Sequence, residues 1–176
     1  MNIDSFKKYN ILEYNEIIER TNYLENGYIA PYYIKTEQFE ILPYEKIDKK
    51  LRLILLELLN IEFKPIIYTE QYIRFTWNKT DIFYVITTSN QQELIGCIAI
   101  DNKNYTPFIS NLFITNEYRN KGYSTILLEY AYNFIKMLGF NKVRLWCNDD
   151  LINFYIKKNW IFENKINDKN IMIYNI

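Results

Sequence analysis

The chain has 176 residues, of which 49% are hydrophobic and 24% charged, with only four glycines and four prolines. This composition excludes a disordered chain, and the length suits a single domain, residues 1–176, with its own core. Lys plus Arg equals Asp plus Glu at 21 each, which argues against the broad positive field of proteins that bind nucleic acid or anionic membranes.

Histidine is absent, so His-based triads, His metal ligands and His general bases are excluded. Two cysteines cannot form a zinc site by themselves, and we expect no metal. Cys97 and Cys147 lie in apolar strand-like runs, where free cysteines behave as small buried hydrophobes in a reducing compartment. We see no segment apolar enough to span a bilayer and no signal-peptide core, and therefore expect a cytoplasmic protein without a membrane partner.

The first half of the chain gives few clear signals. Residues 6–12 favour a strand, and residues 13–26 a helix that Gly27 would cap in the left-handed conformation. From Pro43 to residue 60 apolar residues recur at helical spacing, and Pro65 ends the pattern. Thr69 is placed to cap a short helix that runs to Trp77. The longer helix is predicted to bury one face, made of Leu51, Ile54, Leu55, Leu58 and Leu59.

The second half gives a clear order of elements. Residues 82–89 and 93–100 are rich in β-branched and aromatic residues and flank a polar turn at 89–92, which predicts a hairpin. A third strand follows at 108–115, and a helix runs from about residue 123 until Gly139 stops it. Residues 142–147 favour a buried strand, 149–158 a short helix and 171–176 a last strand. The whole half reads strand, strand, strand, helix, strand, helix, strand, strand.

A charged loop containing Gly122 joins the third strand to the helix after it. A helix start presents unpaired backbone amides and the positive end of the helix dipole, which together bind anions. Gly122 lets the backbone approach a diphosphate, while Arg119 and Lys121 add cationic donors. The alternative is a plain turn with both cations in solvent. A Walker loop and a GxGxxG motif are absent, which argues against nucleoside triphosphates and NAD.

The loop resembles the central motif of the GNAT superfamily of acetyl-CoA-dependent N-acetyltransferases: Arg or Gln, two residues, Gly, one residue, then Gly or Ala. Here it reads from Arg119 to Gly122, with Ser124 in the last place. A second motif starts at Asn148 and continues through Tyr155 to Asn159, where the family has Gly. Asn tolerates the left-handed conformation needed there. The resemblance is close over residues 82–176 and weak over 1–80.

The resemblance implies an α+β (mixed α/β) fold: a mostly antiparallel mixed sheet, flanked by helices and splayed between its fourth and fifth strands. The third strand listed above would pair its backbone with the pantetheine arm of the co-substrate, acetyl-CoA. Residues 82–176 would bind acetyl-CoA, and the divergent residues 1–80 would face the acceptor. The implied cofactor-binding residues are Leu112, Phe113, Ile114, Arg119, Asn120, Lys121, Gly122, Tyr123, Ser124, Thr125 and Asn148.

The implied reaction is direct attack of a primary amine on acetyl-CoA. Tyr155 matches the family's general acid, with a phenol pKa near 10 against about 8.5 for a thiol, and a backbone N–H near Ile114 would stabilise the oxyanion. Asn148 can also serve as a helix cap. Glu93, Asp101, Asp149 and Asp150 lie near strand ends, but none is assigned as the base.

The acceptor is expected to be a small-molecule or peptide amine, with residues 68–77 supplying aromatic surface that could equally be core. The second hypothesis is a non-catalytic acyl-CoA sensor or interaction module with the same fold. A nucleic-acid modifier is disfavoured by the zero net charge. A homodimer is left open.

Overall fold

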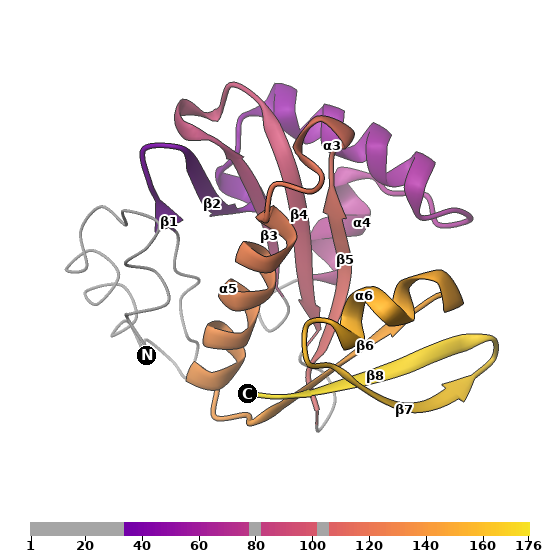
Figure 1. Ribbon diagram of the computed structural model, residues 1–176. Helices are drawn as coiled ribbons and strands as arrows, with labels where there is room; N and C mark the ends of the chain where they lie inside the picture. The colour runs from indigo at the N-terminus through magenta and orange to yellow at the C-terminus, as the bar shows by residue number, and fades with distance from the viewer. Residues whose placement is uncertain (1–33, 78–81, 102–105) are drawn as a thin grey trace.

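The computed structural model describes residues 34–77, 82–101 and 106–176. The strand predicted at 6–12 and the helix predicted at 13–26 lie outside these ranges. Over the described residues the chain forms one eight-stranded sheet with helices on both faces (Figure 1), which confirms the predicted mixed class. The strands are β1 (Ile34–Lys35), β2 (Phe39–Pro43), β3 (Ile82–Thr88), β4 (Leu94–Asp101), β5 (Phe108–Ile114), β6 (Lys142–Cys147), β7 (Ile161–Ile166) and β8 (Lys169–Asn175). The helices are α3 (Lys49–Glu62), α4 (Glu70–Thr76), α5 (Tyr123–Met137) and α6 (Ile152–Ile156).

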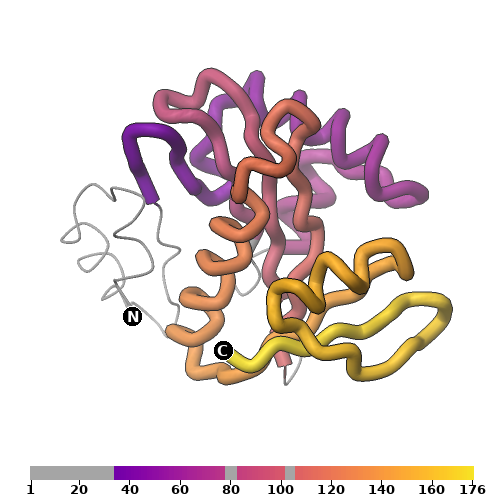
Figure 2. Tube along the Cα trace, viewed as in Figure 1, coloured from indigo at the N-terminus to yellow at the C-terminus, as the bar shows by residue number. Residues whose placement is uncertain are grey.

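The sheet has the order β1-β2-β3-β4-β5-β6-β8-β7, and β5 and β6 are its one parallel pair within the described ranges. Only Phe108 with Arg144 and Ile109 with Leu145 are in register between these two strands. Beyond those pairs the strands diverge, as Figure 2 shows. This is the predicted splay, and it falls between the fifth and sixth strands here because the short β1 precedes the others.

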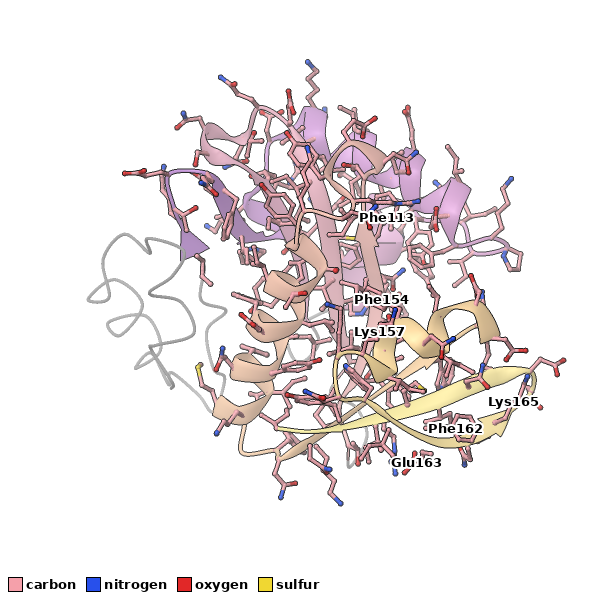
Figure 3. The ribbon with its side chains drawn as sticks, in the orientation of Figure 1. Phe113, Phe154, Lys157, Phe162, Glu163 and Lys165 are labelled. Atoms are coloured by element: carbon pink, nitrogen blue, oxygen red, sulfur yellow. The ribbon has the colours of Figure 1, made fainter. Side chains whose placement is uncertain are left out.

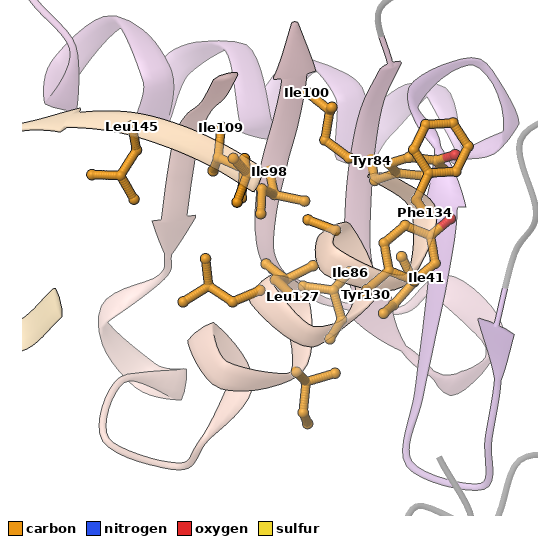
Figure 4. Packing of buried hydrophobic residues seen from close by; sticks show 14 of the residues in the cluster. Ile41, Tyr84, Ile86, Ile98, Ile100, Ile109, Leu127, Tyr130, Phe134 and Leu145 are labelled. Carbon is orange, nitrogen blue, oxygen red and sulfur yellow. The ribbon is translucent and has the colours of Figure 1, made fainter. Parts of the chain in front are cut away.

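Two hydrophobic cores lie on opposite faces of the sheet. Since side chains alternate along a strand, Tyr84 and Ile86 of β3 face one core while Phe83 and Val85 face the other. Helix α5 covers the first core, part of which Figure 4 shows, and α3 and α4 cover the second. Strands β3, β4 and β5 are therefore held between two layers of helices.

Helix α3 begins later than predicted. Pro43 ends strand β2, and a 3-10 turn, Tyr44–Lys46, separates it from the helix. The Asp48 carboxylate accepts a hydrogen bond from the Lys50 amide and so caps the first turn. The helix proper therefore runs from Lys49 to Glu62.

The predicted buried face of α3 is right for Leu51, Leu55 and Leu59 but wrong for Ile54, which is 36% exposed. Leu56 is buried instead. Residues 54 and 56 lie on opposite flanks of the stripe centred on Leu55, and the helix presents the flank with Leu56 to the sheet. The capping prediction for the next helix is confirmed, since the Thr69 hydroxyl accepts a hydrogen bond from the Tyr72 amide.

Left-handed residues mark the ends of the two C-terminal helices. Gly122 (φ 88°) precedes α5, and Gly139 (φ 88°) follows it as predicted. The helix predicted at 149–158 is shorter, because residues 149–151 form a 3-10 turn and only 152–156 are α-helical. Asn159 (φ 66°) takes the left-handed conformation expected of it.

Strands β4 and β5 approach each other closely and then lose their regular register. A Cβ added at Gly96 would lie 2.2 Å from the carbonyl oxygen of Phe113. Between Cys97 and Ala99 the register shifts, and Asn111 of β5 has a φ of 50°. Such a bulge bends a strand, and this one lies where β5 separates from β6.

No helix in the described ranges is long and apolar enough to cross a bilayer.

Candidate functional site

Strands β5 and β6 are not paired beyond Ile109 and Leu145, and the predicted site residues lie along the gap that this leaves between them. Because these strands are parallel, their C-terminal ends lie at one edge of the sheet, where open α/β sheets bind ligands. Strand β5 leads into the loop before α5, and β6 leads through Asn148 into α6. In Figure 3, Phe113 lies on β5, Phe154 lies on α6, and Lys157 directly follows that helix.

The loop before α5 presents unpaired backbone amides. Asn120 (φ 60°) and Gly122 (φ 88°) are both left-handed, and over the described part of the chain the amides of residues 120–124 donate no hydrogen bond. A side chain at Gly122 would meet no atom within 4 Å. These free amides, the positive end of α5 and the open space before Gly122 fit a diphosphate.

Arg119 and Lys121 have partners within the protein. The Arg119 Nε donates a hydrogen bond to the carbonyl oxygen of Ile114 at 3.0 Å, and its Nη2 lies 3.8 Å from the Glu62 carboxylate. The Lys121 ammonium lies 5.2 Å from the centre of the Tyr118 ring. Arg119 therefore ties the loop to the end of β5, and it occupies one of the backbone acceptors that the sequence assigned to the pantetheine arm.

Tyr118 anchors the loop on its other side. Its hydroxyl donates a hydrogen bond to the Glu93 carboxylate, and this bond, with burial, raises the pKa of Tyr118 to about 12. Its ring packs edge-to-face on Tyr123 at 5.6 Å, and Tyr123 packs on Phe39 at 6.1 Å. This chain of aromatic contacts holds the first turn of α5 against β2.

Tyr155 lies on α6, on the side of the helix that packs into the first core. Its side chain is 6% exposed and makes edge-to-face contacts with Phe154 at 5.0 Å and Trp160 at 5.8 Å. The hydroxyl has no hydrogen-bond partner among the described residues, yet it is not sealed from solvent. Burial, and secondarily Cys147, raise the pKa of Tyr155 above its ordinary value of 10, so the phenol carries its proton at neutral pH.

Asn148 marks the end of β6 but does not cap the turn that follows with its side chain. Its Oδ1 accepts a hydrogen bond from the Lys169 ammonium at 2.6 Å. Next to it, Asp149 accepts hydrogen bonds from Asn170 and Lys165, which lower the pKa of Asp149 in that order of importance. Glu93, another of the carboxylates considered as a base, is likewise engaged, by the Tyr118 hydroxyl.

The aromatic segment expected to line the acceptor site packs mostly into the second core. Tyr68 is 3% exposed and Ile73 is 1% exposed, whereas Phe75 is 80% exposed. The Tyr68 hydroxyl accepts a hydrogen bond of 2.6 Å from Asn111 Nδ2. Residues next to α4 therefore contact β5 at its bulge, beside the gap.

Sequence reasoning missed the contact between Lys158 and α5. The Lys158 ammonium donates a hydrogen bond to the Thr125 hydroxyl and lies 5.0 Å from the centre of the Phe154 ring. The two bonded residues are 33 positions apart in the chain. The local sequence contains no signal for this contact, because Lys158 lies beyond the end of α6 and its partner belongs to a separate helix.

A model of the acetyltransferase (GNAT) family matches residues 53–159, more than half of the chain. The search of curated proteins found no match to this chain. Among solved structures, an acetyltransferase from Streptococcus agalactiae has a TM-score of 0.61 at 18% identity, over 80% of this chain and 99% of the other. The PaiA N-acetyltransferase of Thermoplasma acidophilum, solved in complex with coenzyme A, has a TM-score of 0.57 at 20% identity, over 78% and 99%. A GNAT family acetyltransferase from Elizabethkingia anophelis with acetyl-CoA bound has a TM-score of 0.59 at 15% identity, over 80% and 100%.

The likeness to these structures shows a shared fold, and the family model spans both the loop before α5 and Tyr155. This chain therefore belongs to the acetyltransferase (GNAT) family.

Proposed function

We propose that this protein transfers an acetyl group from acetyl-CoA to the primary amine of a small molecule or peptide. The observation that carries the proposal is the free amides of residues 120–124 at the start of α5, next to the gap between the parallel strands β5 and β6. Family membership supports acyl transfer as the general chemistry. Residues 82–176 would bind the co-substrate, and residues 1–80 would form the acceptor side of one domain.

The loop would hold the diphosphate. Its amides need no rearrangement to donate, because over the described ranges they bond to no other group, and the left-handed Gly122 keeps the approach open. Arg119, bonded to Ile114, would act mainly by fixing the loop to β5, so that the diphosphate and the strand keep one relative position. Lys121 would add charge at the surface.

The backbone of Leu112 and Phe113 would pair with the pantetheine arm, in the manner of an added strand. These residues have no β6 partner, because the register ends at Ile109. Ile114 would contribute its N–H toward the oxyanion, while its carbonyl stays with Arg119. Acetyl-CoA supplies the activated acyl group, and the protein supplies position and donors.

Tyr155 would give its proton to the sulfur as the C–S bond breaks. The raised pKa keeps the phenol protonated before the reaction. Because thiolate, the conjugate base of a thiol with a pKa near 8.5, is a weaker base than phenolate, transfer to free thiolate would be uphill, so the proton would move while the C–S bond breaks and the phenolate would then regain a proton from water. The attacking amine loses its proton to water or to a base not yet assigned. The Oδ1 of Asn148 already accepts a hydrogen bond from Lys169. Asn148 would therefore contact the co-substrate while it keeps that bond.

Tyr155→Phe tests this role, with Tyr174→Phe as the matched control. Tyr174 belongs to the neighbouring aromatic cluster and stacks on Tyr132 at 4.3 Å. We expect Tyr155→Phe to lower kcat by about 10²- to 10⁴-fold with little change in CoA affinity, and the control to retain activity. An unchanged kcat would remove Tyr155 from the mechanism. CoA binding without turnover over a broad amine panel would favour the acyl-CoA sensor.

A further inference from the structure

Lys158 places a partly buried positive charge beside the first turn of α5. Its chain leaves the end of α6, passes the Phe154 ring at 5.0 Å and donates to the Thr125 hydroxyl. Thr125 is the third residue of α5, directly after the free amides of the loop. Over the described part of the chain no carboxylate lies within 4.0 Å of this ammonium, so both of its partners are uncharged.

This position is unfavourable for a cation when no anion is near. The start of a helix carries about half a positive charge, which repels an ammonium within the first turn, and partial burial removes water from the charge. Burial accordingly lowers the pKa of Lys158, an effect that Glu129 on α5 opposes at longer range. The Thr125 hydroxyl and the Phe154 ring contact the ammonium but do not neutralise its charge.

We propose that the Lys158 ammonium binds the diphosphate of the co-substrate, together with the free amides of residues 120–124. This inference rests on the proposed function. One anion between the loop and α6 would neutralise both the helix terminus and the ammonium, which otherwise repel each other. The Thr125 hydroxyl holds the ammonium in place until the anion arrives.

The test compares Lys158→Met with Lys136→Met. Methionine keeps an unbranched apolar chain of nearly the same length but removes the ammonium and its charge. Lys136 lies in the last turn of the same helix, where a cation is favourable, so its replacement makes the same change in net charge far from the loop. Calorimetric titration with CoA should show binding weakened about tenfold to a hundredfold in Lys158→Met and within twofold of wild type in Lys136→Met.

Thermal unfolding without ligand supplies a second readout, the melting temperature. Replacing a lysine that only stabilises the fold would lower the melting temperature, whereas replacing a lysine held for ligand binding would not. Removing the repelled charge should leave the melting temperature of Lys158→Met at or above that of wild type, by up to about 3 °C. A melting temperature clearly below wild type, or failure of the variant to fold, would contradict the inference, since it would make Lys158 a stabilising contact. Lys158→Arg keeps the charge and should retain CoA affinity within about fivefold.

Shortened ligands identify the group that Lys158 binds. The loss caused by Lys158→Met should persist with dephospho-CoA, which keeps the diphosphate, and vanish with pantetheine, which has no phosphate. Equal affinities of Lys158→Met and Lys136→Met for CoA would overturn the inference and leave the proposed function intact. Absence of CoA binding by the wild-type protein would refute the proposed function itself.

Discussion

Gly96→Ala tests whether the position of β5 controls both stability and function. The added Cβ would lie 2.2 Å from the Phe113 carbonyl oxygen, and ordinary contact begins at 3.4 Å, so the strand must move by about 1.2 Å (3.4 minus 2.2) to accept it. A second contact, 2.8 Å to the Ile114 Cδ1, can be relieved by rotation of that side chain. The backbone contact cannot, because the oxygen belongs to the neighbouring strand.

The expected losses follow from that movement. Overpacking of this kind costs about 1–3 kcal/mol, which for a chain of this length lowers the melting temperature by about 2–12 °C. Residues 112–114 are also those proposed to pair with the co-substrate, and misplacement by about 1 Å can reduce turnover by about a hundredfold. Thermal unfolding and acetyl transfer to an accepted amine measure the two effects.

Gly139→Ala is the matched control for this substitution. Gly139 has a φ of 88° and, unlike Gly96, no atom within 4 Å of an added Cβ, so alanine there meets only backbone strain of about 1–2 kcal/mol. It lies at the far end of α5 from the loop and should leave CoA affinity unchanged. A Gly96→Ala protein that melts within 1 °C of wild type and turns over normally would refute the close-approach reasoning.

Two further predictions test the second core and the loop anchor. Leu55→Ala should destabilise the protein by about 2–5 kcal/mol, while Ile54→Ala, on the exposed flank, should cost well under half of that in the same denaturant titration; equal losses would contradict the assigned face of α3. The Tyr118 hydroxyl should stabilise the fold fully below pH 10 and lose its contribution between pH 10 and about 12, because folding raises its pKa and the folded state then keeps the proton longer. The difference in unfolding free energy between wild type and Tyr118→Phe should therefore shrink over that range, and a constant difference would be evidence against the bond to Glu93.

Local signals predicted the second half of the chain well. The loop before α5 could be found because a glycine, a helix start and an apolar repeat follow one another within a few residues, and Gly139 and Asn159 could be assigned left-handed conformations from residue type. The 3-10 turn that shortens the helix after β6 has no comparable signal. Its bounds depend on how the chain leaves a strand that is paired with β8.

The contacts that assemble the site depend on residues far apart in the sequence. Strand β2 is short and ends at a proline, so only its pairing with β3 makes it recognisable. The choice of Leu56 over Ile54 depends on the plane of the sheet, which the helix sequence does not contain. The bulge at Asn111 and the bond from Lys158 to Thr125 arise from pairs of elements brought together by the fold.

Binding of acetyl-CoA at the loop before α5 is tested most directly by calorimetric titration of the wild-type protein and of Gly122→Val. We predict one site per chain in the wild type and binding at least about tenfold weaker in the variant, because a β-branched residue strongly disfavours the positive φ that opens this loop. Heat of binding that is absent from the wild type, or identical in the two proteins, would contradict a diphosphate site at residues 119–124.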